Sequence, residues 1–60
     1  MLWTAEKYAD ETCVETVRVP YFELCSILVE WTKQYMETGR FDSIHVYQED
    51  KYPVGRWIYL

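Results

Sequence analysis

The chain has 60 residues, of which 50% are apolar and 18% aromatic, and its ten acidic and six basic side chains give a net charge of −4. This length predicts a single domain and excludes a multidomain protein, while the apolar content excludes a disordered chain. The acidic balance lacks the basic footprint of a protein that binds DNA or RNA directly, so no direct nucleic-acid contact is expected.

The start of the chain, MLWTAEKY, lacks the basic and apolar regions of a signal peptide, and no apolar run approaches the roughly 20 residues of a membrane span. We therefore expect a cytoplasmic protein that contacts no membrane. The spacing of Cys13 and Cys25 fits neither a redox motif nor a zinc site. Both are expected to be small buried thiols, with a single strand-to-helix disulfide as the alternative.

Residues 2–10 are ambiguous. Thr4 could cap a short helical turn, or Trp3, Tyr8 and Ala9 could lie along an edge strand. The alternation of TCVETVRV predicts a strand over residues 12–19, with two faces: Cys13, Val17 and Val19 on one, and Thr12, Thr16 and Arg18 on the other. Val14 and Glu15 break the alternation, which indicates a bulge or a poorly covered outer face.

A helix is predicted from Pro20 to about Thr38. Proline fits the first helical turn, and Gly39 can adopt the left-handed conformation that ends a helix. The polar residues fall in one sector of roughly 100°: Glu23, Ser26, Glu30, Lys33, Gln34 and Glu37.

The apolar arc of this helix spans about 220°, twice what packing on one sheet requires. The residues predicted to face the core are Leu24, Leu28, Trp31 and Tyr35, while Phe22, Val29 and Met36 form one flank and Ile27 the other. Either loops and the N-terminal segment cover these flanks, or a second chain does.

Two further strands are predicted as a hairpin over residues 40–48 and 54–60. In the first, Ile44 and Val46 point one way, and Phe41, Ser43, His45 and Tyr47 the other; in the second, Ile58 and Leu60 share one face, and Trp57 and Tyr59 the opposite one. Pro53 cannot donate to a ladder, so the connecting loop extends at least to it, and Gly55 marks a candidate bulge.

These elements predict an α+β domain: a three-stranded antiparallel sheet with one long helix on one face, in the order β-α-β-β. The opposite face then carries the aromatic patch of His45, Tyr47, Trp57 and Tyr59. Such a patch is typical of an interface, with a partner or with a second copy of the chain. The alternative is that Leu2, Trp3 and Tyr8 fold back over it.

No catalytic or metal-binding pattern is present. His45 is the only histidine, Ser26 and Ser43 lie outside any nucleophile motif, and the chain has no glycine-rich phosphate loop. His45 is expected at the surface of its strand. We expect a protein without enzymatic activity, metal or cofactor.

The carboxylates instead suggest a basic protein partner, through Glu30, Glu37, Glu49 and Asp50. In size and charge the chain resembles the small acidic proteins with which bacteriophages inhibit host nucleic-acid enzymes, including uracil-DNA glycosylase inhibitors and anti-CRISPR proteins. Asp42-Ser43-Ile44 is similar to the Glu-Ser-Ile strand motif of the glycosylase inhibitors, with aspartate replacing glutamate.

This resemblance implies an inhibitor that mimics DNA in the basic groove of an enzyme, inside a bacterial cell. Asp42 and Ser43 would then take phosphate-mimicking roles, and Phe22, Val29 and Met36 would form an apolar pocket for the enzyme. The alternative function is a homodimeric structural or regulatory module without DNA mimicry.

Overall fold

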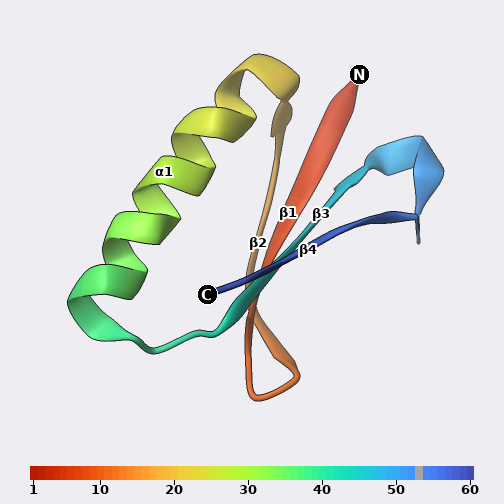
Figure 1. Ribbon diagram of the computed structural model, residues 1–60. Helices are drawn as coiled ribbons and strands as arrows, with labels where there is room; N and C mark the ends of the chain where they lie inside the picture. Colours follow the sequence, from red (N-terminus) through yellow and green to blue (C-terminus); the bar gives the residue numbers. More distant parts are fainter. Residues whose placement is uncertain (53) are drawn as a thin grey trace.

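The structure is a computed structural model that describes residues 1–52 and 54–60. It is an α+β domain in which one helix packs on one face of a four-stranded antiparallel sheet (Figure 1). The elements in chain order are β1 (Leu2–Ala9), β2 (Thr12–Pro20), α1 (Tyr21–Thr38), β3 (Ser43–Gln48), the short 3-10 helix η1 (Glu49–Lys51) and β4 (Gly55–Tyr59). The strands are ordered β2-β1-β3-β4 across the sheet.

The predicted three-stranded sheet in the order β-α-β-β was wrong, because residues 2–9 form an additional strand. This strand, β1, lies inside the sheet and pairs with both β2 and β3, so that Ala5 lies between Val17 and Val46. The turn into β2 consists of Asp10 and Glu11, with φ angles of 50° and 67°. Glycine or asparagine usually occupies such positions, and neither is present to signal the turn.

The predicted helix is confirmed between Tyr21 and Thr38, but Pro20, which was expected in its first turn, is instead the extended residue that ends β2 and precedes the helix. Gly39 has a φ of 61°, and its N–H donates to the carbonyl of Tyr35 at 2.8 Å, which closes the last turn. Of the residues predicted to face the core, Leu24 and Trp31 are buried, and Leu28 and Tyr35 are partly buried against it. Ile27, which was assigned to a flank, also packs against the core.

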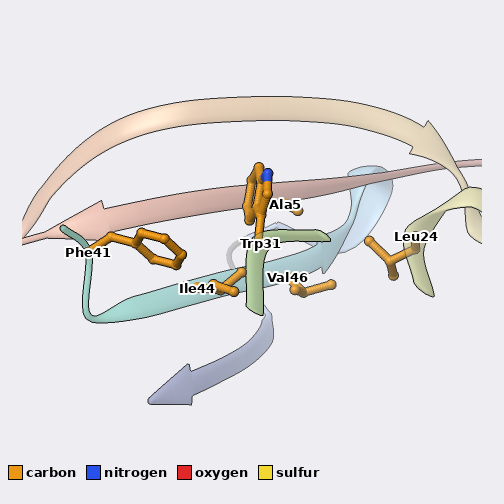
Figure 2. Close-up of a cluster of buried hydrophobic side chains, with 6 residues drawn as sticks. All are labelled: Ala5, Leu24, Trp31, Phe41, Ile44 and Val46. Carbon is orange, nitrogen blue, oxygen red and sulfur yellow. The ribbon is translucent and has the colours of Figure 1, made fainter. Parts of the chain in front are cut away.

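The hydrophobic core lies between α1 and the sheet, where Figure 2 shows its six buried side chains: Ala5, Leu24, Trp31, Phe41, Ile44 and Val46. Ile44 and Val46 face the helix as predicted. Phe41 was predicted on the opposite face and is instead buried in this core, with its ring 5.8 Å from that of Tyr35. It precedes β3, so strand alternation does not determine its direction.

The prediction of two buried cysteines was wrong, since Cys13 and Cys25 are both exposed and free. The predicted bulge exists: Lys7 pairs with Glu15 but Tyr8 pairs with Cys13, which leaves Val14 as the extra residue. This irregularity turns Cys13 to the sheet face that carries Tyr8, away from the helix.

The predicted hairpin of β3 and β4 is confirmed, with Ile44 opposite Ile58 and His45 opposite Trp57. Gly55 is not a bulge but the first residue of β4, paired with Tyr47. The prediction for Pro53 lies outside the described residues.

Lys7 is buried between the sheet and the helix, with 6% of its surface exposed. Its Nζ lies 2.9 Å from Glu15 Oε1 and donates to Gln34 Oε1 at 2.7 Å. The same atom lies 4.6 Å from the ring centre of Trp31 and 4.7 Å from that of Phe41. One ammonium group therefore joins β1, β2, α1 and the segment before β3.

Replacing Lys7 tests this arrangement. Lys7→Ala removes the stem and the ammonium contacts, and we expect it to lower the free energy of unfolding by about 2–4 kcal/mol. Lys7→Met keeps the apolar stem, so we expect a smaller loss of about 1 kcal/mol. Urea denaturation measures both, with Lys33→Ala on the exposed helix surface as the control. A Lys7→Ala protein within about 0.5 kcal/mol of the parent would contradict the assigned role.

Candidate partner-binding face

Among residues 1–52 and 54–60, no second layer covers the sheet face turned away from α1, and we call this face the open face (Figure 1). Cross-strand pairing arranges the residues of β1, β3 and β4 on this face in three rows: Tyr8–Ser43–Tyr59, Glu6–His45–Trp57 and Thr4–Tyr47–Gly55. The aromatic patch predicted from the sequence lies within these rows. Tyr8 and Glu6 extend it onto β1.

The middle row holds a buried histidine. His45 Nδ1 lies 3.0 Å from Glu6 Oε1, which also accepts a hydrogen bond from the Tyr8 hydroxyl at 3.3 Å. The Trp57 ring stacks on the imidazole with 4.5 Å between centroids and 14° between planes. His45 was expected at the strand surface, but these neighbours leave it only 6% exposed.

Gly55 leaves space for this packing. A Cβ atom there would lie 2.5 Å from the Val46 carbonyl oxygen and 3.0 Å from His45 Nε2. A side chain at this position would therefore clash with the β3 backbone and with the imidazole. The requirement for glycine is close approach between β3 and β4, which the sequence pattern could not distinguish from a bulge.

A groove of about 800 Å³ lies at one end of the open face. It is lined by Tyr8, Asp10, Glu11, Asp42, Ser43, Trp57, Tyr59 and Leu60. Ser43 is the small member of its row, between two tyrosines, and it lines the groove between them. We call it the Ser43 groove.

Carboxylates gather at the Ser43 groove. Asp42 Oδ1 accepts from the Ser43 hydroxyl at 3.0 Å, and Asp42 Oδ2 accepts from the Asp10 backbone N–H at 3.3 Å. These bonds connect the β1–β2 turn to the start of β3. Within residues 1–52 and 54–60, Asp10, Glu11 and Asp42 form no ion pair, whereas Glu15 and Glu49 each do.

The structure divides the predicted partner-binding residues among several surfaces. Asp42 and Ser43 lie at the groove, beside the aromatic patch. Ile44 is 1% exposed in the core. Three of the helix residues, Phe22, Val29 and Met36, are exposed on α1, as are Glu30 and Glu37. Glu49 is paired with Arg18, and Asp50 lies in η1, at the end of the molecule away from the β1–β2 turn (Figure 1).

Sequence reasoning missed the contributions of Tyr8, Asp10 and Glu11 to this site. The sequence signal for β1 was an alternation, with Thr4, Glu6 and Tyr8 on one face of a strand and Trp3 and Ala5 on the other. Lys7 also falls on the second face, which is the core side, and therefore interrupts its apolar pattern. Without β1 assigned as an interior strand, the turn carboxylates could not be placed next to Asp42.

The arrangement offers aromatic surface and negative charge, which together attract cations. The Ser43 hydroxyl is hydrogen-bonded to Asp42 and not to His45. In the described residues no three or more histidine, cysteine or acidic side chains are placed so that they could hold a metal ion, and no helix is long and apolar enough to cross a membrane. Comparison of the chain with protein-family models, curated proteins and solved structures finds no match.

Alkaline titration tests the environment of the open face. Burial raises the pKa of Tyr8 and of Tyr47 above 10.0, and the Glu6 carboxylate raises both further. Because the folded state favours the neutral phenol, the stability contributed by each tyrosine is present below pH 10 and is lost as pH rises through the raised pKa.

We expect Glu6→Gln to lower the pKa of both tyrosines, measured by NMR from the phenol carbon shifts, and therefore to make the loss of stability at alkaline pH smaller. Glu37→Gln on α1 is the control and should change neither pKa. Unchanged tyrosine titrations in Glu6→Gln would contradict the assigned role of Glu6.

Proposed function

We propose that this chain is a non-enzymatic binding protein that docks on the basic surface of a nucleic-acid-processing enzyme and inhibits it by occupying the place of DNA. The observation that supports the proposal is the Ser43 groove, where Asp10, Glu11 and Asp42 have no ion-pair partner among the described residues and lie beside exposed aromatic rings. The net charge of −4 agrees with a basic partner.

The two kinds of groups would contribute differently to binding. Carboxylates at the end of the open face would accelerate association with a positive surface and set its register. Trp57 and Tyr59, 45% and 78% exposed, would supply apolar area at the centre of the contact.

The resemblance to glycosylase inhibitors bears on one residue in particular. Asp42 is exposed at the groove, and we propose that its carboxylate takes the role of a phosphate mimic. Ser43 holds the Asp42 carboxylate through its hydroxyl, so it would position the acid and not contact the enzyme itself. Ile44 would not contact the enzyme and would contribute only by stabilising the hydrophobic core.

Two matched variants test which acidic surface binds. Asp10→Asn with Glu11→Gln removes two charges at the groove, while Glu30→Gln with Glu37→Gln removes two from α1. We expect the groove variant to weaken binding by about tenfold and the helix variant by no more than about twofold. The partner is first obtained by capture from a bacterial lysate, and affinity is then measured at low and high salt.

Competition with duplex DNA distinguishes DNA mimicry from binding that does not involve the DNA-binding surface of the partner. We expect duplex DNA to displace the chain from the captured enzyme and the chain to inhibit that enzyme, with uracil excision by uracil-DNA glycosylase as the first assay. A captured partner that binds no nucleic acid, or whose binding DNA does not affect, would overturn the proposal.

A homodimer is the second candidate, supported by the exposed flank of α1. Phe22, Val29 and Met36 are 78%, 56% and 79% exposed and lie seven residues apart, on one line along the helix. Cys25 and Thr32 lie between them in the three-and-four spacing of a helix–helix seam. A groove of about 770 Å³ between α1 and β4, lined in part by Leu28 and Ile58, adds further apolar surface.

Sedimentation at micromolar concentration tests the dimer. We expect a monomer–dimer equilibrium that Val29→Lys shifts to the monomer without loss of folding, since Val29 is exposed and outside the core. Thr38→Lys, at the helix end, is the control with the same added charge. A single monomeric species at all concentrations would contradict this candidate.

A further inference from the structure

We propose that the Ser43 groove binds the guanidinium group of an arginine side chain presented by a basic protein partner. This inference rests on the proposed function for its biological setting, but it concerns a direct binding property of this chain. It is supported by three features of the groove: the shape left by Ser43, the orientation of the rings around it, and the carboxylates at its end, which form no ion pair with any described residue.

The shape follows from the first row of the open face. Tyr8 on β1 and Tyr59 on β4 lie on either side of Ser43 on β3. The serine is 7% exposed, and its short side chain is turned to Asp42, so it forms a low floor between two taller walls. A chain-like ligand can therefore lie between the tyrosines over the serine.

The rings suit a flat cation. Trp57 and Tyr59 are nearly parallel, with 15° between their planes and 6.3 Å between centroids, and Tyr8 lies 5.0 Å from Trp57 at 53°. The faces of tryptophan and tyrosine attract cations, and a planar guanidinium can stack on them. A lysine ammonium is compact and more strongly hydrated, so it gains less from such walls.

The carboxylates supply the charge that a guanidinium needs. Asp42 accepts one hydrogen bond at each oxygen, and a carboxylate has about four acceptor sites, so it retains capacity for an N–H donor. Asp10 and Glu11 line the same groove. A paired guanidinium and carboxylate form charge-assisted hydrogen bonds, which are stronger than neutral ones.

NMR titration of the full chain with Nα-acetyl-arginine amide tests the proposal without any partner protein. We expect saturable shifts at Tyr8, Ser43 and Tyr59, with a dissociation constant on the order of millimolar. The citrulline analogue, which is neutral and of similar shape, should produce no saturable shifts. The lysine analogue should bind at least about threefold more weakly than the arginine amide.

Variants locate the site. Tyr59→Leu removes a wall that is mostly exposed, so the fold should persist, and we expect arginine affinity to fall at least about fivefold. Tyr21→Leu makes the same change on α1 and should leave affinity unchanged. Asp42→Asn should weaken binding, whereas Glu30→Gln should not.

Three outcomes would overturn the inference: shifts that do not saturate, equal binding of arginine and citrulline, or affinity unaffected by Tyr59→Leu. A failed enzyme inhibition assay alongside a positive arginine titration would instead reject only the proposed function. The arginine titration and the enzyme inhibition assay therefore test the inference and the proposed function independently.

Discussion

The buried ammonium group of Lys7 is the interaction on which the arrangement of the layers depends. A charge taken from water is costly unless other groups replace its hydration. Here Glu15 from β2 and Gln34 from α1 bind the Nζ atom, and the rings of Trp31 and Phe41 flank it. The helix can therefore lie over β1 in only a narrow range of positions. Because β1 pairs with both β2 and β3, this contact ties the helix to the interior strand and leaves the open face on the other side.

One helix can cover one face of a sheet, so the open face must limit its own exposure to water. It does so through cross-strand aromatic packing, in which Trp57 covers His45 and Glu6 binds the imidazole from the other side. The rings that shield the sheet are also the apolar surface available to a partner. Tyr59, by contrast, is largely exposed and contributes little to shielding. A substitution at Tyr59 therefore tests binding better than a substitution at Trp57.

The parts of the fold that follow from local chemistry could be predicted from the sequence: the helix between Pro20 and Gly39, the β3–β4 hairpin and the inward direction of Ile44 and Val46. The first strand was open only as an alternative, at the sheet edge, and its interior position could not be predicted, because Lys7 occupies a core position and its solvation comes from residues distant in sequence. The aromatic patch was predictable from alternation. The groove was not, since Asp10, Glu11 and Asp42 meet only after β1 enters the sheet between β2 and β3.

The strained turn between β1 and β2 links the fold to the proposed binding site. Glu11 has a φ of 67° without being glycine, a conformation that costs about 1 kcal/mol or more. The turn is held by strand pairing on one side and by the bond from the Asp10 N–H to Asp42 on the other. It thereby keeps two exposed carboxylates beside the groove. Because the apolar flank of α1 lies on the opposite layer, association through the helix would leave these carboxylates and the open face accessible. Dimer formation and binding of a basic partner are therefore compatible in one molecule.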